Sequence, residues 1–504
     1  MARLPLFGRL YYREYVAVIV GFLVLFFEGI LRFVIFFLPD PIIWWFREQT
    51  RRLFKAFMHI DGPFSHSMFS TGVSSEEAHR AHLIRVAVEF GDLCKVYGYE
   101  WEEHIVHTKD GFLLALHRIP RARGEVYGDN AKKPVVYLHH GLLMCSDVFL
   151  CTTRASRALP LVLAEAGYDV WLGNNRGNKY SRKHMSLSPH SLSFWNFGMD
   201  EYALYDIPDS IGYILETTGE SSLSYVGFSQ GTAQAFAALS INPALNKKVN
   251  AFVALAPAIS PSGLSAPLVD GLMKASPALM YLFFGRRSIL ESTTTWQSIL
   301  YPPIFTAIIS RSLSFLFAWS SARITTTQKI AAYAHLYSTT STKAVVHWFQ
   351  IMRNAEFTMY DDDVRSGLSP LVFKAGDRGK ARFYYRPARF PTRNIKTPTV
   401  LLYGTRDSLV DIDVMKSQLP EHAKAIPLDG YEHLDILWGE HVHREVIPHV
   451  LRALRENARI PEPVLKGKAE PGTVKINGYG NGSGSENENG HAGDTIDIDE
   501  LADI

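Results

Sequence analysis

The chain has 504 residues, of which 47% are hydrophobic, so it can bury one large core or two to three smaller ones. Its formal net charge of +2 gives no reason to expect a nucleic acid or a strongly acidic partner. The three cysteines leave at least one thiol unpaired, and none of their spacings fits a metal site. We therefore expect free thiols and a body that faces the cytosol, with a Cys145–Cys151 bridge as the alternative.

The first predicted element is a hydrophobic anchor over residues 1–48. Its apolar part, 16–38, is interrupted only by Glu28 and Arg32. As a helix this part would extend about 35 Å, whereas the hydrocarbon core of a bilayer is about 30 Å thick. Glu28 and Arg32 are spaced i, i+4, so they can pair on one helix face, which lowers the cost of burying them. A cleaved signal peptide is disfavoured, because the run is too long and no small-residue cleavage site follows.

Basic residues flank this apolar run on both sides, so the distribution of charge does not orient it. They are Arg3, Arg9 and Arg13 before the run, and Arg47, Arg51, Arg52 and Lys55 after it. Such flanks fit a single span, but they fit a monotopic hairpin or an interfacial helix at least as well. A hairpin keeps both ends on the cytosolic face and can also lie in a phospholipid monolayer. A buried core helix is the weakest alternative for a run of this length.

Residues 49–89 are predicted to connect the anchor to a compact body. In the body, runs typical of buried strands alternate with helical patterns. The predicted strands are 134–139, 168–172, 224–228, 251–255 and 399–403, and helices are predicted at 157–166 and 200–217. This alternation predicts an α/β fold with a mostly parallel sheet and helices on both faces. Functional residues should then lie at the carboxyl ends of the strands.

The interval 260–393 breaks the alternation and is predicted to be a helical cap over the active site. Its apolar pieces are each too short to span a bilayer. The cap divides the body into a first part of the core, 90–259, and a second part, 394–458. The last segment, 459–504, is rich in Gly, Asn, Ser, Glu and Asp, and we expect it to be a disordered acidic tail.

The five residues 227–231 spell Gly-Phe-Ser-Gln-Gly, between a predicted strand and a stretch of helix formers. G-x-S-x-G at such a turn is the nucleophile elbow of α/β-hydrolases. Gly227 and Gly231 flank the serine because the turn leaves no room for side chains beside it. Ser229 is therefore the predicted nucleophile.

A serine nucleophile needs a base, and the base needs an orienting carboxylate. Asp407 follows the predicted strand 399–403 through a short turn, and His433 lies in a loop before the last helical stretch. The order Ser229, Asp407, His433 is that of α/β-hydrolases. Other candidates are less suited: Asp411 and Asp413 are interpreted as helix-start residues, and His441 and His443 as surface residues.

The oxyanion of an acyl-transfer reaction needs two backbone N–H donors. The residue after the nucleophile, Gln230, should supply one, and Leu142, in the loop after the strand 134–139, should supply the other. His139 and His140 could instead indicate a metal pair, but adjacent residues on a strand point to opposite faces. We expect no metal and no cofactor.

The motifs together make the chain similar to the acid-lipase family of α/β-hydrolases, which includes gastric and lysosomal lipases and fungal steryl ester hydrolases. The matching segments are 102–104 with 108–112, 140–143, 173–178, 194–197, 205–208, 227–231, 404–407 and 433–435. The start of the chain and residues 283–300 look like the fungal lipid-droplet steryl ester hydrolases. This resemblance implies the same roles for Ser229, Asp407, His433, Leu142 and Gln230.

We therefore expect a serine esterase that cleaves long-chain lipid esters, steryl esters first, through an acyl-enzyme. A triacylglycerol lipase is the alternative, and a catalytically silent lipid-droplet scaffold is a further one. The expected partners are the lipid ester and a membrane or lipid-droplet monolayer, with no nucleic acid and no protein partner. The expected location is the lipid droplet or the endoplasmic reticulum membrane, with the catalytic body facing the cytosol.

Overall fold

The computed structural model describes five long stretches of the chain and several single positions. The stretches are 74–125, 132–259, 277–289, 300–362 and 387–457, and the positions are 19, 23, 26, 30, 41, 42, 45, 48–52, 261, 291, 293, 296 and 297. Most of the predicted anchor, several parts of the cap and the whole segment 459–504 lie outside the described residues. Among the described residues, no helix combines the length and the hydropathy that a membrane span requires.

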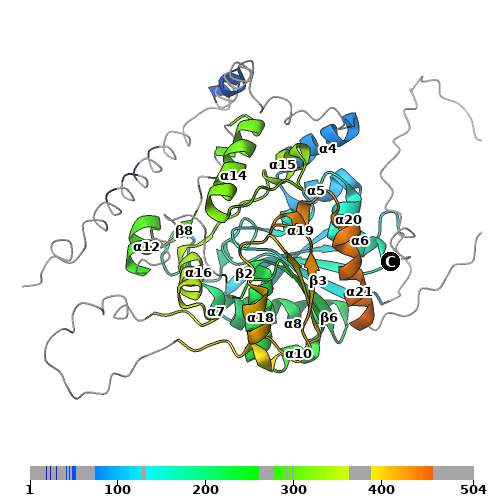
Figure 1. Ribbon diagram of the computed structural model, residues 1–504, viewed down its shortest axis with the longest axis vertical. Helices are drawn as coiled ribbons and strands as arrows, with labels where there is room; N and C mark the ends of the chain where they lie inside the picture. The colour runs from blue at the N-terminus through cyan, green and yellow to red at the C-terminus, as the bar shows by residue number, and fades with distance from the viewer. Residues whose placement is uncertain are drawn as a thin grey trace, which may run out of the picture.

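A twisted sheet runs through the centre of the body (Figure 1). Among the described residues its strand order is β1-β2-β4-β3-β6-β7-β10-β11, and β5 pairs with β2. Neighbours from β4 to β11 are parallel, whereas β1, β2 and β4 pair antiparallel. The bounds are β1 Glu102–His107, β2 Phe112–Ile119, β3 Val135–His139, β4 Asp169–Gly173, β5 Lys183–His184, β6 Leu223–Phe228, β7 Val249–Leu255, β10 Thr399–Gly404 and β11 Lys424–Leu428. The mostly parallel sheet predicted from the sequence is confirmed.

Side chains alternate between two hydrophobic cores, one on each face of the sheet. On β3, Val136 and Leu138 join one core, and Val135 and Tyr137 join the other. The first core lies under α5 Phe90–Tyr97, α6 Leu159–Glu165, α19 Asp435–Trp438, α20 Val442–Glu445 and α21 Ile447–Asn457. The second lies under α8 Ile207–Thr218, α9 Gln230–Ile241 and α18 Ile412–Gln418. Burial on both faces explains why the central strands are continuous apolar runs.

The helix predicted over 200–217 is present but is not uniform. It begins as the short α7 Met199–Glu201, passes through a π-helical turn, η3 Tyr202–Asp206, and continues as α8. Pro208 stands at the start of α8, where a missing N–H costs no intrahelical bond. The short α10 Leu245–Lys248 leads into β7.

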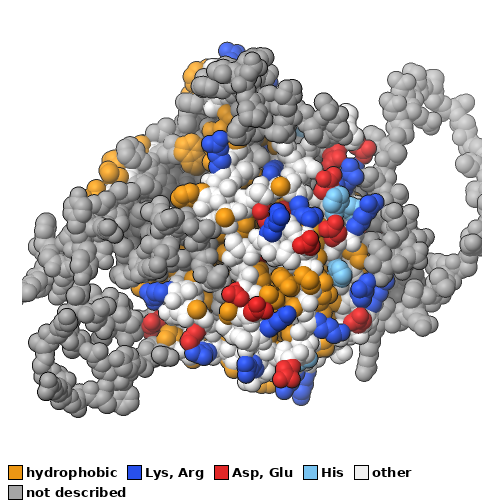
Figure 2. Space-filling view, in the orientation of Figure 1, with side chains coloured by type: hydrophobic (Ala, Val, Ile, Leu, Met, Phe, Trp, Pro, Cys, Tyr) orange, Lys and Arg blue, Asp and Glu red, His pale blue; other side chains and the backbone are white. Residues whose placement is uncertain are grey.

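The described part of the cap contains four helices, α12 Pro277–Phe284, α14 Pro302–Phe317, α15 Thr326–Ala332 and α16 Thr342–Asn354. On α16, Trp348 and Ile351 enter the core on one face of the sheet. On α14, by contrast, Ile308 and Phe315 are 47% and 56% exposed. Figure 2 shows hydrophobic side chains on the surface near α14.

The segment predicted as a plain connection, 49–89, contains a helix, α4 Ser75–Val86, that packs against α15 (Figure 1). Ser74 caps this helix by accepting a hydrogen bond from the N–H of Glu77 at 3.1 Å. Most of the helix is polar, and only Ala81 and Ile84 are buried. So weak an apolar pattern does not predict a packed helix.

Candidate active site

Ser229 is the single residue between β6 and α9, at the carboxyl end of a central strand. Its backbone angles are φ 53° and ψ −118°, in a region that a residue with a side chain occupies at a cost. Its N–H donates to the carbonyl of Leu255 on β7 at 2.9 Å. The strand-to-helix turn therefore holds the serine in a strained conformation that neighbouring elements enforce.

The two glycines of the turn are required by close packing. A Cβ at Gly231 would lie 2.3 Å from the carbonyl oxygen of His139, and a Cβ at Gly227 would lie 2.8 Å from the carbonyl oxygen of Gly231. Neither approach leaves room for a methyl group. The first turn of α9 thus lies directly on the end of β3.

Asp407 and His433 are brought together from separate loops. Asp407 follows β10, and His433 follows β11, the next strand in the sheet. Nδ1 of His433 lies 2.6 Å from Oδ2 of Asp407, and Oδ1 of Asp407 accepts from the N–H of Leu409 at 3.0 Å. Both side chains are buried. Because a carboxylate only accepts, the proton of a neutral His433 lies on Nδ1, and Nε2 is left to accept a proton.

The ring of His433 lies between two aromatic side chains. Phe228, the residue before the nucleophile, is 5.1 Å away between ring centroids, and Trp319 is stacked on the ring at 5.0 Å with an interplanar angle of 8°. Within the described residues, Ser229 and His433 are not hydrogen-bonded to each other. Such bonds are often long without substrate and tighten when it binds.

The cap segment 317–321 contacts the loops that carry both residues. The carboxylate of Glu432 accepts from the N–H and hydroxyl of Ser320, at 2.9 and 3.0 Å, and from the N–H of Ser321 at 2.7 Å. The indole of Trp319 donates to the hydroxyl of Ser408 at 3.1 Å. Glu432 adjoins His433 and Ser408 adjoins Asp407, so the cap helps to position these two predicted site residues.

The loop that carries Leu142 lies against the nucleophile. A Cβ at Gly141 would be 3.1 Å from the Cβ of Ser229. Nδ1 of His140 lies 2.8 Å from the carbonyl oxygen of Gly141, and Nε2 of His140 accepts from the N–H of Asn175 at 3.2 Å. Burial lowers the pKa of His140 to about 4, so the ring is neutral and donates from Nδ1. Since the Gly141 carbonyl and the Leu142 N–H belong to one peptide group, His140 orients that N–H.

Gln230, the second predicted donor, is the first residue of α9, and its N–H has no partner inside the helix. Its side chain is fixed from the cap, because the indole of Trp348 donates to Oε1 at 2.8 Å. The two predicted donors thus flank Ser229. Leu142 lies on the loop 140–147 after β3, which we call the oxyanion loop, and Gln230 lies on α9.

Our reason for setting aside a His139–His140 metal pair was wrong. The two rings do not point to opposite faces but stack, with centroids 5.1 Å apart and an interplanar angle of 29°. His140 lies just past the end of β3, where the alternation of a strand no longer holds. Burial also lowers the pKa of His139 well below its usual value.

The alternative acid and base candidates lie elsewhere. Asp411 caps α18 by accepting from the N–H of Val414 at 3.1 Å, which confirms its interpretation as a helix-start residue, and Asp413 is in the first turn of α18. His441 is exposed and His443 is half-buried. All three cysteines are buried and free, so the Cys145–Cys151 bridge is not formed.

Several segments that carry the family resemblance meet beside the site. The buried guanidinium of Arg176 pairs with Asp110 at 2.5 Å and with Asp206 at 2.5 Å. Nearby, Asn175 accepts from the side chain of Gln234 on α9 at 2.9 Å. These contacts join the turn before β2, the loop after β4 and the start of α8 into one support for the oxyanion loop.

Comparison with known proteins agrees with this geometry. A family model described as "alpha/beta hydrolase fold" matches residues 134–440, and one described as "Partial alpha/beta-hydrolase lipase region" matches residues 90–153. A probable lipase of Schizosaccharomyces pombe is 44% identical over 472 residues, which cover 94% of this chain and 98% of that protein. The human lysosomal acid lipase/cholesteryl ester hydrolase is 34% identical, covering 69% of this chain and 86% of that protein. The human gastric triacylglycerol lipase is 30% identical, covering 74% and 92%.

The fold and the family match define the class, and the chain belongs to the alpha/beta hydrolase fold family. Within it, the lipase-region match and the lipase relatives make the protein a carboxylic ester hydrolase of the acid-lipase type.

Proposed function

We propose that Ser229, His433 and Asp407 form a catalytic triad that hydrolyses long-chain lipid esters, with steryl esters as the first choice of substrate. The pairing of His433 with Asp407 at 2.6 Å, beside a serine held at φ 53°, is the observation that carries this proposal. That arrangement provides an oriented base with Nε2 available, close to the hydroxyl of a half-buried serine on a strained turn.

The reaction follows from the chemistry of these groups. His433 Nε2 takes the proton of Ser229 as Oγ attacks the ester carbonyl carbon, and Asp407 stabilises the imidazolium. The N–H groups of Leu142 and Gln230 hold the negative oxygen of the tetrahedral intermediate. His433 then returns the proton to the departing sterol oxygen, which leaves an acyl-enzyme. Water, deprotonated by the same histidine, attacks the acyl carbon and releases the fatty acid.

The choice of steryl esters rests on resemblance. The start of the chain and residues 283–300 are similar to fungal steryl ester hydrolases, and one relative has cholesteryl ester hydrolase in its name. Another relative is a triacylglycerol lipase, so triacylglycerols are the second candidate. Both substrates would use the same triad.

We also propose that residues 1–48 attach the enzyme to a lipid-droplet monolayer or the endoplasmic reticulum membrane, with the catalytic body facing the cytosol. The apolar run 16–38 supports this attachment. The described residues of this run, Ile19, Leu23, Phe26 and Ile30, are helical, and their side chains are exposed. Exposed apolar side chains on a helix fit a lipid surface.

Three assays separate the parts of this proposal. A fluorophosphonate probe should label wild-type protein and not Ser229→Ala, and absence of labelling in folded wild-type protein would exclude a serine hydrolase. Rates on cholesteryl oleate and triolein, with Ser229→Ala as the blank, decide the substrate, and much faster turnover of triolein would refute the steryl ester choice. Flotation of full-length and 49–504 protein with artificial droplets tests the anchor, which should be required for co-flotation.

A further inference from the structure

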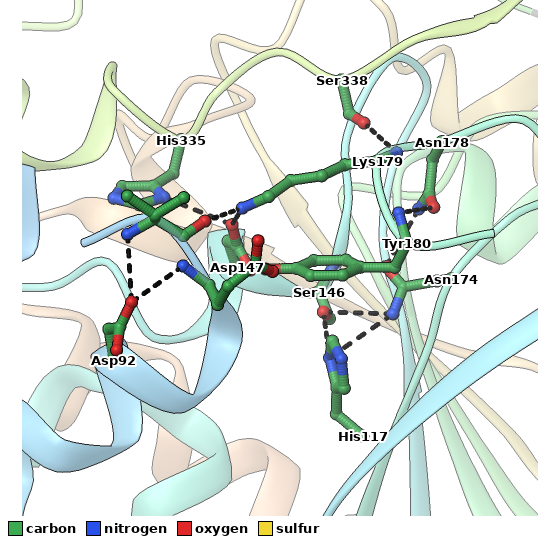
Figure 3. Close-up of polar contacts among 12 residues, drawn as sticks. Asp92, His117, Ser146, Asp147, Asn174, Asn178, Lys179, Tyr180, His335 and Ser338 are labelled. Carbon is green, nitrogen blue, oxygen red and sulfur yellow. Dashed lines mark hydrogen bonds and ion pairs between the residues drawn. The ribbon is translucent and has the colours of Figure 1, made fainter. Parts of the chain in front are cut away.

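Asp147 is a buried carboxylate that the proposed mechanism does not use. It lies on the 3₁₀ helix η1, Ser146–Phe149, five residues after Leu142, and is 1% exposed (Figure 3). A carboxylate in that position would be costly to bury alone, so its partners must compensate for the lost water.

Three donors from two distant segments surround Asp147. Lys179 Nζ lies 3.0 Å from Oδ2, the hydroxyl of Tyr180 lies 2.8 Å from Oδ1, and His335 Nδ1 lies 3.3 Å from Oδ2. Burial by itself would raise the pKa of Asp147, but the hydrogen bond from His335 and the charge of Lys179 outweigh it and hold that pKa below its usual value. Asp147 is therefore an ionised, fully paired group.

Two of these partners extend the network to the N-terminal helices. Nε2 of His335 lies 2.7 Å from the carbonyl oxygen of Ile84 in α4, and Lys179 also bonds the carbonyl oxygen of Val88. The two ring nitrogens of His335 thus face the carboxylate of Asp147 and the carbonyl of Ile84. Asp147 is the point where the oxyanion loop, the loop after β4, the cap and the α4–α5 region meet.

The oxyanion loop needs to be held, because Leu143 has φ 60°, in the left-handed region. For a residue with a branched side chain this conformation costs about 1–2 kcal/mol. The carbonyl of Leu143 accepts from the N–H of Ser338 in the cap at 2.6 Å. Ser338 is in turn bonded by the N–H of Lys179, at 2.9 Å to its hydroxyl. The cap segment 335–338 therefore bonds the loop twice, at Leu143 through Ser338 and at Asp147 through His335. Lys179 contacts both Ser338 and Asp147.

We propose that Asp147 is a positioning residue for ester hydrolysis: its bonds to His335 and Lys179 keep Leu143 left-handed and so keep the N–H of Leu142 aimed at the oxyanion. This inference rests on the oxyanion role proposed above for Leu142. A loop that relaxed to an ordinary φ at Leu143 would turn the peptide group between Leu142 and Leu143. Because that peptide group fixes the position of Leu142, the preceding peptide group, which carries the Leu142 N–H, would shift with it. The ester would still bind, but its tetrahedral intermediate would lose a donor.

The test compares Asp147→Asn with a matched control, Asp169→Asn. Asp169 is also a buried carboxylate, paired with Arg118 by two bonds of 2.9 Å, but it stands at the amino end of β4, whereas the site lies at the carboxyl ends of the parallel strands. With 4-nitrophenyl butyrate, kcat of Asp147→Asn should fall roughly 10- to 100-fold while KM stays within about twofold, the signature of an interaction made only in the transition state. Asp169→Asn should lose thermal stability and keep kcat within about twofold.

Both variants are assayed below their unfolding temperatures, and active sites are counted by fluorophosphonate labelling. Equal losses of kcat per labelled site in the two variants, or an unchanged kcat in Asp147→Asn, would overturn the proposal. Failure of wild-type protein to label would instead refute the proposed function itself. If Asp147→Asn does not fold, His335→Gln decides: it leaves Asp147 paired with Lys179 and Tyr180, and kcat should fall roughly 3- to 10-fold. A wild-type kcat in His335→Gln would contradict the inference.

Discussion

Gly231 lets the first turn of α9 pack directly on the carbonyl of His139. A Cβ at this position would lie 2.3 Å from that carbonyl oxygen, which is too close for any side chain. We predict that Gly231→Ala displaces α9, costs about 1–3 kcal/mol of folding free energy and lowers kcat/KM more than tenfold. Gly212→Ala is the control, because Gly212 lies in α8 and no described atom is within 4 Å of the added Cβ. That variant should be as stable as wild type or up to about 1 kcal/mol more stable. Urea unfolding and ester hydrolysis measure both effects, and equal behaviour of the two variants would contradict the prediction.

Asp435 lies two residues after His433, and its ionisation should lower the free energy of unfolding as the pH rises from 4 to 6. Burial, with the nearby charge of Glu432, raises its pKa from 3.8 to about 6. Oδ2 accepts from the N–H of Glu432 at 2.8 Å, but Oδ1 has no partner among the described residues. Between pH 4 and 6 the native state binds this proton more tightly than the unfolded state does. The folded protein therefore loses up to about 3 kcal/mol as the pH rises through that window.

Asp435→Asn removes the charge, so we predict that the variant is about 1–3 kcal/mol more stable than wild type at pH 8 and close to wild type at pH 4. Urea unfolding at the two pH values measures the difference. The same change in stability at both pH values would show that ionisation of Asp435 is not its cause.

The catalytic candidates could be predicted from the sequence because each follows a local pattern. Ser229 stands in a five-residue motif, and Asp407 and His433 follow recognisable positions in chain order. Trp319 and Glu432 could not be found in this way. Their contacts with Ser408, Ser320 and His433 join residues 89 to 114 positions apart, and neither one lies in a pattern that marks a partner. The sequence likewise contains no pattern that predicts the strained φ of Leu143.

At the scale of elements, the cap segment 317–321 contacts His433, the base that we propose. We predict that Trp319→Ala lowers kcat about tenfold with little change in KM, because the ring of His433 loses the surface that fixes its orientation. Trp319→Phe keeps an aromatic face but loses the bond to Ser408, so its loss should be smaller. Trp296→Ala is the control, since that cap tryptophan is 40% exposed. Kinetics on a soluble ester measure all three, and a wild-type kcat in Trp319→Ala would refute the role.

The strands that sequence reasoning missed, β1, β2, β5 and β11, lie at or next to the edges of the sheet. Central strands such as β3 and β6 are buried on both faces and are continuous apolar runs. The edge strand β1 is mostly polar and half-exposed, and the other edge strand, β11, contains Pro427, which an edge tolerates. Edge strands obey weaker patterns because water covers part of their surface. All five predicted strands were found, with ends that differ by at most two residues.

At the scale of the whole molecule, the fold shields its thiols. Burial raises the pKa of Cys94, Cys145 and Cys151 well above the usual value for a thiol, and none is bonded to another. We predict that maleimide labels none of the three in native protein within minutes and all three in strong denaturant. Mass spectrometry counts the adducts, and stability should not depend on a reducing agent. Rapid labelling of the native protein would show that the core opens far more readily than its packing indicates.

The cap is bonded to the loops that carry Leu142, Asp407 and His433 at residues 319–321 and at residues 335–338, and α12 and α14 precede both segments. A chimera between relatives should therefore be cut just before residue 317. The donor would supply the helices that precede the cut, and this chain would keep the segment that follows. Such a graft would change which substrates the enzyme selects, and it would leave the proposed catalytic residues of this chain in place.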